Sequence, residues 1–415
     1  MKKIYLEFLR GISSVFILGW HLIFLAPTGH PTRFAGYWGT DALMLFFMLS
    51  GLVINMSQST KPKTTIPFLT NRFIRIYPQF LIGILLAFIA LYITNTTFPS
   101  IKTTIGNLFL VSTMNDYMGY IVPSIQSNLA VWSLSFEVAF YVLFAFTIGR
   151  YQKKALICWF MISLIAIPLH FLRSDRDVFT HAIAIFSFSS IWLVGYYIYE
   201  YRHLIYTDKY VVLFSLGVLP LISRMHFSAN FYDPFRYFIF AIFAIPFFRY
   251  CLQLPPAGKK IKIIYVVIPH ILIVFAALTI RYLPLKNAIA YSTLPYVYIG
   301  LGYLADVLKI NARLKDFINK SGAIMGKYSY SLYISHFPIV FIFSKLMHNI
   351  WGYVFFCLPV VFVVAYSLET WLQPAVVKYF RKAKAMVPAT ESTAGNYPET
   401  ISPYLFPAGR PEIIA

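Results

Sequence analysis

The chain has 415 residues, of which 59% are hydrophobic and only 12% are charged, and its formal net charge is +20. Soluble domains carry about a quarter of charged residues, so this composition excludes a soluble globular protein and predicts a multi-pass helical membrane protein. The positive charge does not indicate nucleic-acid binding, because no polar domain presents basic residues interleaved with aromatic ones.

Apolar windows of about 17–22 residues recur along the chain and are long enough to cross a bilayer. They lie near 4–26, 38–56, 73–94, 129–149, 155–172, 181–200, 235–249, 263–280, 288–305, 328–347 and 351–371, with a weaker window at 210–222. We therefore expect an all-α transmembrane bundle of about ten to twelve helices.

Basic residues mark every second connection between these windows and predict the orientation of the chain. The positions that fall on this one side are Lys2, Lys3, Lys61, Lys63, Arg72, Arg75, Arg150, Lys153, Lys154, Lys259, Lys260, Lys262, Lys309, Arg313, Lys315, Lys320, Lys327, Arg381, Lys382 and Lys384. The positive-inside rule then places both termini in the cytoplasm, and the polar stretch 95–128 on the outer side.

The chain divides into a membrane domain, residues 1–375, and a cytoplasmic tail, residues 376–415. The tail is expected to be disordered, because it becomes rich in Pro, Thr, Ser and Gly. Cys158, Cys251 and Cys357 lie in separate apolar windows without short spacing, so we expect buried thiols and no metal site.

Arg10 and His21 are eleven positions apart in the first apolar window. Eleven helical steps of about 100° bring the second residue to within roughly 20° of the first, so both lie on one stripe, about 16 Å apart along the axis. Ionisable groups at such depth cost about 2.5–3.5 kcal/mol each and are usually kept for function. This stripe is the first place where we expect chemistry.

Other polar residues interrupt the later windows. Ser50 and Gly51 end an apolar run, where small residues allow a neighbouring backbone to approach. Arg72 and Arg75 share a helix face at the cytoplasmic end of the third window, where they either grip an anion or anchor the helix at the interface.

The fourth window carries a polar stripe, because Ser133, Glu137 and Tyr141 are spaced four residues apart. A carboxylate at this depth should face the bundle interior, either as a catalytic group or as a counter-ion of an arginine. Late in the chain, Tyr333 and His336 lie on a second polar face, where His336 is either a hydrogen-bonded interior residue or part of the site.

In chain order these residues resemble the motifs of the acyltransferase 3 family, bacterial integral membrane enzymes that O-acylate glycans and other acceptors. The matching motifs are Arg10-Gly11 followed by His21, Phe46-Phe47 with Ser50-Gly51, Arg72-x-x-Arg75-Ile76-Tyr77-Pro78, Trp132-Ser133-Leu134 with Glu137, and Tyr330-Ser331-Leu332-Tyr333 with His336. The resemblance runs from about residue 4 to 375. It implies a location in the bacterial plasma membrane.

The resemblance also implies the substrates. The donor would be an acyl-CoA, most often acetyl-CoA, that arrives from the cytoplasm as a substrate, and no cofactor would be bound permanently. The acceptor would be a hydroxyl of a cell-surface polysaccharide or of its lipid-linked precursor.

One motif departs from the family pattern: Met44 occupies a position where members often carry Asp, and Asp41 lies three residues earlier. Asp41 either replaces that carboxylate or the role is absent, while Glu369 resembles a loosely defined acid of the family.

Acyl transfer to a hydroxyl needs the groups that this sequence offers. His21 supplies a base near neutral pH, and Glu137 or Asp41 would orient its ring. Arg72, Arg75 and Arg10 would bind the phosphates of coenzyme A. Donors to the developing oxyanion would be Ser133, Tyr333 or His336. Direct transfer and an acyl-histidine intermediate both remain open.

Two other functions fit the same hydropathy profile. A transporter or flippase of lipid-linked glycans would also have about twelve helices, but such proteins often show two related halves, and this sequence shows no internal repeat. A structural partner of a glycan polymerase would need no His21.

For the enzyme, we expect the polar faces of the first, third, fourth and late His336-bearing helices to enclose a cleft between the two membrane faces.

Overall fold

The computed structural model describes residues 4–27, 38–113, 122–149, 151–172, 177–225, 233–254, 270–271, 274–275 and 285–386. Within these ranges the secondary structure is helical apart from two strands of two residues each, which pair in parallel. Eight helices are long and apolar enough to cross a membrane. The expected all-α, multi-pass bundle is thus confirmed.

The helices follow the predicted windows closely. Their bounds are α1 Ile4–Phe24, α2 Trp38–Thr60, α3 Thr65–Ile93, α4 Ile101–Leu108, α5 Trp132–Thr147, α6 Gln152–Leu172, α7 Val178–Glu200, α8 Lys209–Arg224, α9 Pro234–Cys251, α11 Leu285–Val307, α12 Ile310–Leu346, α13 Ile350–Ser367 and α14 Gln373–Met386. A 3₁₀ segment, η2 (Gln126–Val131), precedes α5, and a π-helical turn, η3 (Leu368–Leu372), joins α13 to α14. The window 263–280 lies almost entirely outside the described residues, as do Lys2, Lys3, Arg150, Lys259, Lys260 and Lys262.

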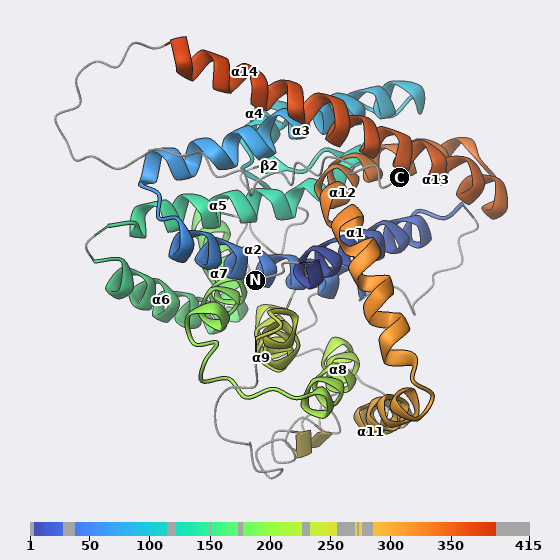
Figure 1. The fold of residues 1–415 in the computed structure, drawn as a ribbon. Helices are drawn as coiled ribbons and strands as arrows, with labels where there is room; N and C mark the ends of the chain where they lie inside the picture. Colours follow the sequence, from blue (N-terminus) through green and yellow to red (C-terminus); the bar gives the residue numbers. More distant parts are fainter. Residues whose placement is uncertain are drawn as a thin grey trace, which may run out of the picture.

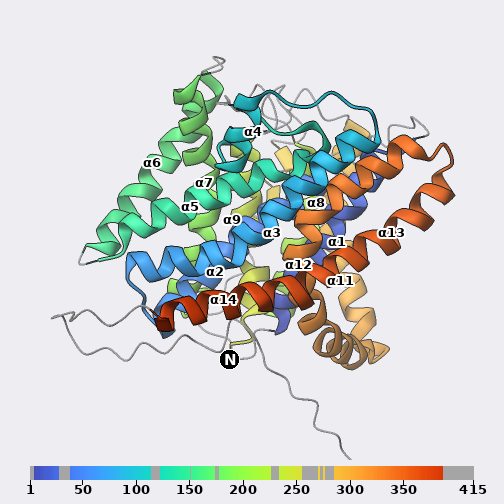
Figure 2. The ribbon, with the colours of Figure 1, turned by 90° about the horizontal axis from the view of Figure 1, so that it is seen from above.

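The helices form a row, and α12, with α3 and α13 beside it, packs against the α1 end of that row (Figure 1). α2 lies between α1 and α7, and the row continues through α9 and α8 to α11. α12 packs along α1 and also against α3 and α13, while α5 packs against α3 and α7. Figure 2 shows the same bundle from above, with α3, α12 and α13 side by side. The helices that carry the family motifs therefore meet around α12.

The contacts also define helix direction. α1 and α12 run parallel, because Arg10 bonds to Gly326 and the later His21 contacts the later His336. α3 has the same direction, because Tyr330 bonds to Ile76 and the later Ser331 bonds to Gln79. Lys63, at the start of α3, and Lys153, after α5, line one cavity. The basic connection between α2 and α3 and the one between α5 and α6 therefore lie at the same end of the bundle, as the sequence pattern predicts.

Glycines allow α2 and α7 to cross with their backbones in contact. A Cβ on Gly51 would lie 2.0 Å from the carbonyl oxygen of Trp192, and one on Gly195 would lie 1.9 Å from that of Met48. Real side chains do not fit at such distances, so only glycine permits this crossing. The close approach predicted from the Ser50–Gly51 pair is confirmed.

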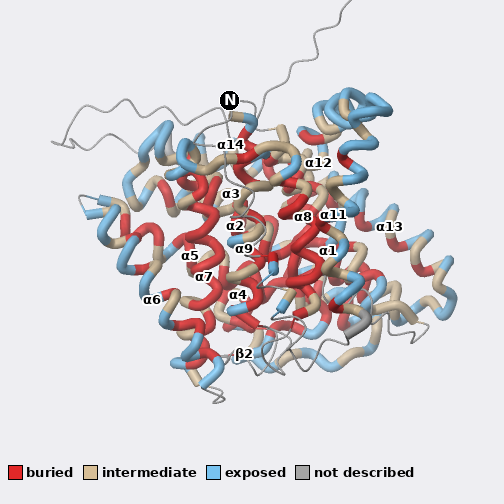
Figure 3. Tube along the Cα trace, turned by 90° about the horizontal axis from the view of Figure 1, so that it is seen from below, coloured by how far each residue is buried: buried red, intermediate tan, exposed pale blue. Residues whose placement is uncertain are grey.

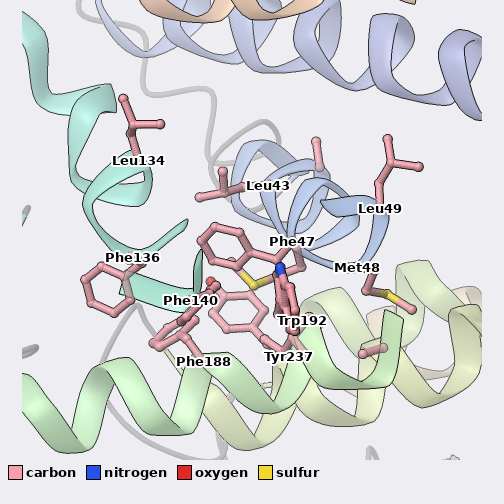
Figure 4. Close-up of a cluster of buried hydrophobic side chains, with 14 of the residues drawn as sticks. Leu43, Phe47, Met48, Leu49, Leu134, Phe136, Phe140, Phe188, Trp192 and Tyr237 are labelled. Atoms are coloured by element: carbon pink, nitrogen blue, oxygen red, sulfur yellow. The ribbon is translucent and has the colours of Figure 1, made fainter. Parts of the chain in front are cut away.

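Aromatic side chains fill the space beneath this crossing. Figure 3 shows that buried residues concentrate in the central helices, whereas α6, α13 and the start of α12 expose much of their surface. The close-up in Figure 4 shows Phe47, Phe140, Phe188 and Trp192 packed together, with Tyr237 from α9 beside them. Tightly interlocked rings of this kind hold α2, α5, α7 and α9 in a fixed arrangement.

The connection 95–128 is more structured than a simple outer loop. It contains α4, the strands β1 (Ser112–Thr113) and β2 (Val122–Pro123), and the start of η2, while 114–121 lies outside the described residues. Ser127 donates to the carbonyl of Ala87 at 2.8 Å, and Asn128 donates to that of Gly83 at 3.3 Å. The connection thus folds back along α3 and covers the interior of the bundle from that side.

The C-terminal tail and one of the three thiols differ from what the sequence predicts. The tail predicted from residue 376 is helical as far as Met386, and residues 387–415 lie outside the described residues. The prediction that all three thiols are buried is wrong for Cys158, which is exposed on the outer surface of α6, whereas Cys251 and Cys357 are buried. α6 lies at the edge of the bundle, so one face of this largely apolar helix remains uncovered.

Candidate active site

Two histidines from distant parts of the sequence meet inside the bundle. His21 lies in the last turn of α1 and His336 lies within α12, and both side chains are buried. Nε2 of His336 is 2.9 Å from Nδ1 of His21. Trp20 and Phe337 flank the His21 ring, with centroids 4.4 and 4.8 Å away. The pair is therefore held between aromatic side chains, where water is largely excluded.

Two hydroxyl groups lie near His336: Tyr333 is one turn earlier on α12, and Ser133 comes from the start of α5. Tyr333 and Ser133 hydrogen-bond to each other, and Tyr333 also donates to the carbonyl oxygen of Ala130 in η2. The rings of Tyr333 and His336 are 5.8 Å apart. Of the oxyanion donors proposed from the sequence, Ser133 and Tyr333 are thus brought together next to the histidine pair.

Glu137 is part of a polar chain that crosses three helices. Its carboxylate accepts a hydrogen bond from Tyr141, whose hydroxyl is 2.9 Å from Oγ of Ser50. Trp192 donates its indole N–H to the same Oγ at 3.3 Å. The stripe predicted on the fourth window does face the interior, and Ser50 has a hydrogen-bonding role besides its small size.

Neither carboxylate proposed to orient His21 contacts it in the described structure. Glu137 bonds to Tyr141 instead, and α2 turns Asp41 toward α9, where Arg236 lies 3.6 Å from its Oδ1. Arg236 is fully buried, so its charge needs the opposite charge of Asp41 nearby. The side-chain partner of the His21 ring is His336, and the ring also has a backbone hydrogen bond to Ile17, one turn earlier in α1.

Arg10 is anchored on α12. Its guanidinium donates to the carbonyl oxygen of Gly326 at 2.5 Å. A Cβ on Gly11 would lie 2.3 Å from Cβ of Met325, so α1 and α12 touch directly beside this bond. Arg10 and His21 both face α12 from the same continuous helix, which agrees with the predicted stripe.

Arg75 forms a buried ion pair that the family motif does not reveal. Its guanidinium is 2.8 Å from Oε1 of Glu369, whose side chain is only 4% exposed. Glu369 belongs to the π-helical turn η3, and such turns insert an extra residue and redirect side chains, often at functional sites. This pair engages Nη1 of Arg75, so a phosphate at Arg75 would have to share the guanidinium with Glu369.

Further polar groups surround Glu369; Ser331 appears in the sequence only as part of a motif, and Gln79 and Gln373 were not singled out from the sequence. Ser331 donates to its Oε2 at 2.7 Å, and the amide of Gln79 lies 3.3 Å from the same oxygen. The Gln79 amide also donates to Gln373 at 3.0 Å. The available signal was the polar amide of Gln79 inside an otherwise apolar window.

Arg72 has a different environment from Arg75. Its guanidinium carbon lies 5.6 Å from the ring centroid of Phe68 and 5.3 Å from that of Tyr141. Within the described ranges Arg72 makes no ion pair, so its five N–H donors remain available for an anion. It therefore lies beside the Glu137–Tyr141 pair with an uncommitted positive charge.

The two remaining motif residues have structural partners. Trp132 packs edge-on against Phe136 and Phe188 at the start of α5. Tyr77 stacks on Phe73 and donates to the carbonyl of Leu108 at 3.2 Å. Trp132 thus helps to seat α5, and Tyr77 fixes the 95–128 connection against α3.

Two cavities in the described structure lie outside this site. One, of about 510 Å³, is an apolar hollow between α6 and α9, and the other, of about 370 Å³, lies among the ends of α2, α5, α6 and α7. Neither is lined by Arg10 or His21. The helices predicted to enclose a cleft do converge, but in this structure side chains pack closely around the histidines.

Comparison with known families agrees with the motif order. A family model described as an acyltransferase domain, that of acyltransferase 3, matches residues 3–370. No curated protein and no solved structure matches the chain. The site residues described above lie within the matched range, except Gln373, which follows its end.

Proposed function

The chain belongs to the acyltransferase 3 family, and on this premise we propose that it is a membrane-bound O-acyltransferase. The proposed donor is acyl-CoA, with acetyl-CoA as the first choice. The proposed acceptor is a hydroxyl of a cell-surface polysaccharide or of its lipid-linked precursor. A transporter or flippase of lipid-linked glycans shares the helix count, but the family match favours acyl transfer.

The observation that carries this proposal is the buried His21–His336 pair with hydroxyl groups beside it. A base near neutral pH, an excluded solvent and nearby hydroxyl donors are the requirements of acyl transfer to an alcohol. Exclusion of water also favours transfer over hydrolysis of the thioester.

The reaction can be written with His21 as the base. His21 removes the proton of the acceptor hydroxyl as the oxygen attacks the thioester carbonyl carbon, and the carbonyl becomes an oxyanion. The Ser133 and Tyr333 hydroxyls are the proposed donors to that oxyanion, and to reach it they turn away from their resting acceptors, the Tyr333 hydroxyl oxygen and the Ala130 carbonyl. Its collapse breaks the carbon–sulfur bond, and the protonated His21 returns the proton to the leaving thiolate. The products are an O-ester and free coenzyme A.

Arg72 is the proposed contact for the coenzyme A phosphates, because its guanidinium is uncommitted. Arg10, which bonds to Gly326 of α12 and lies on the same helix as His21, is assigned to the thioester end of the donor. In this proposal the acyl-CoA extends from Arg72, at the basic end of the bundle, past Arg10 to the histidine pair. We assign that end to the cytoplasm of a bacterial plasma membrane, with both termini on the same side.

A reconstituted assay tests the proposal. Purified protein in liposomes is supplied with radiolabelled acetyl-CoA and with either isolated surface glycan or its lipid-linked precursor. We expect label to appear in one glycan fraction and to be released by mild alkali, which cleaves O-esters. Glycan that crosses the liposome membrane without gaining label would instead identify a transporter, and the enzymatic proposal would be abandoned.

A further inference from the structure

His336 makes two contacts that determine where its proton lies. Its Nδ1 is 2.7 Å from the carbonyl oxygen of Tyr333 and 3.1 Å from that of Leu332. A carbonyl oxygen only accepts hydrogen bonds, so Nδ1 must be the nitrogen that carries the hydrogen. The helix backbone of α12 therefore sets the tautomer of His336.

The charge state follows from the surroundings. His336 is 1% exposed, and in the described structure no carboxylate contacts its ring. An imidazolium without a counter-ion is costly in such a place, so the ring is neutral. A neutral imidazole with its hydrogen on Nδ1 has a lone pair on Nε2, and this nitrogen accepts hydrogen bonds.

The acceptor nitrogen of His336 faces His21. Because the two nitrogens are 2.9 Å apart, Nδ1 of His21 must donate the hydrogen that Nε2 of His336 accepts. The proton of neutral His21 then lies on Nδ1, and the lone pair of His21 lies on Nε2.

We propose that His336 is a positioning residue that fixes both the tautomer and the ring orientation of His21, and thereby makes Nε2 of His21 the base. This inference rests on the proposed function, in which His21 removes the hydroxyl proton. A carboxylate often performs this service for a catalytic or metal-bound histidine. Here a neutral imidazole replaces it, so the resting pair carries no net charge inside the bundle.

The pair also accounts for the charged state of His21. When Nε2 of His21 takes a proton, Nδ1–H becomes part of a cation, and its hydrogen bond to His336 becomes charge-assisted and stronger. Trp20, Phe337 and Tyr333 flank the two rings and oppose their rotation. The role of oxyanion donor considered for His336 from the sequence does not fit, because its Nε2 accepts and its Nδ1 is occupied.

Nitrogen NMR tests the inference without reference to activity. The full chain is labelled with ¹⁵N-histidine in lipid, and the His21 signals are assigned from those that disappear in His21→Gln. We expect wild-type His21 to show a protonated Nδ1 and an unprotonated Nε2. In His336→Phe, which retains a ring but lacks the acceptor, the form of His21 protonated on Nε2 should appear beside the form protonated on Nδ1, because only the Ile17 carbonyl then remains as an acceptor. A wild-type His21 with its proton on Nε2 would overturn the inference.

Enzyme kinetics provides a second, independent test of the positioning role of His336. His336→Phe should lower kcat by on the order of 10²–10⁴-fold and leave the KM for acetyl-CoA nearly unchanged, because the base is misplaced while donor contacts remain. In His336→Gln the amide oxygen can accept the His21 hydrogen, so we expect a substantial recovery of kcat over the Phe variant.

The matched control is His170→Phe, which makes the same exchange at a buried histidine of α6 whose ring nitrogens have no hydrogen-bond partner among the described residues. Equal losses in the His336→Phe and His170→Phe variants, or no recovery with Gln, would contradict a positioning role. If His336→Phe fails to fold, the wild-type spectrum and the Gln variant still decide. If wild-type protein transfers no acyl group, the proposed function fails, whereas the NMR result still decides the His336 inference.

Discussion

Arg72 and Arg75 lie one turn apart on α3, but of the two only Arg75 has an ionic partner in the part of the chain that the structure describes. Arg72 faces Phe68 and Tyr141, whereas Arg75 pairs with Glu369. If Arg72 grips the donor phosphates in a forked manner, Arg72→Lys should raise the KM for acetyl-CoA by about tenfold with little change in kcat, since Lys cannot form the bidentate contact. An unchanged KM would assign Arg72 to membrane anchoring alone.

Arg75 should affect stability rather than donor binding. Arg75→Met leaves the buried carboxylate of Glu369 without its charge partner, and removal of one member of a buried pair costs about 3–5 kcal/mol. We expect a clear fall in the thermal unfolding midpoint in detergent, and partial recovery in the double variant Arg75→Met/Glu369→Met. A stable Arg75→Met protein with a raised KM would return Arg75 to the donor site.

Residues within one helix were easier to predict than contacts between helices. The Arg10–His21 stripe and the Ser133–Glu137–Tyr141 stripe follow from helical periodicity, and both face the interior. The partner of His21 and that of Arg75 come from helices about 300 residues later. Such pairings depend on which helices pack together, and periodicity within one window carries no information about that.

At the scale of helices, the crossing of α2 and α7 should be intolerant of any side chain. Gly195→Ala would place a Cβ 1.9 Å from the carbonyl oxygen of Met48, so the helices must separate. Overpacking of this kind costs about 1–3 kcal/mol. Gly352→Ala is the matched control, because a Cβ there meets nothing within 4 Å. The two variants are compared by thermal unfolding, and equal midpoints would mean that the crossing is not tight.

The elements themselves were largely predictable, with two informative exceptions. α12 is less apolar than most spans because it carries Ser329, Ser331, Ser335 and His336, all of which are buried against other helices. The 95–128 connection was expected to be an outer loop, but it folds along α3 through hydrogen bonds of Ser127 and Asn128. Polar residues that bond to a neighbouring backbone resemble loop residues in a hydropathy profile.

At the scale of the whole molecule, the direction of the bundle in the membrane is testable. A cysteine at Lys63 lies at the basic end, and one at Lys102 lies in α4 on the 95–128 connection. In a Cys158→Ser background, an impermeant thiol reagent applied to intact cells should label position 102 at once and position 63 only after permeabilisation. The reverse pattern would invert the proposed topology and with it the entry side of the donor.

Composition and window spacing predict the helical class and the order of the helices along the chain. They do not predict which helices pack around α12. Spans in lipid are all apolar outside, so their packing is decided by small residues and buried polar groups. Glycine contacts between α1 and α12 and between α2 and α7 illustrate this, since they fix neighbours that no single window predicts.

The account as a whole depends on His21 as the base, and one comparison tests that most directly. His21→Ala and His170→Ala each remove a buried histidine, and both proteins are reconstituted in equal amounts with labelled acetyl-CoA and the accepting glycan. We predict that His21→Ala loses transfer by on the order of 10²–10⁴-fold while His170→Ala stays close to wild type. Transfer by His21→Ala at the wild-type rate would contradict the account.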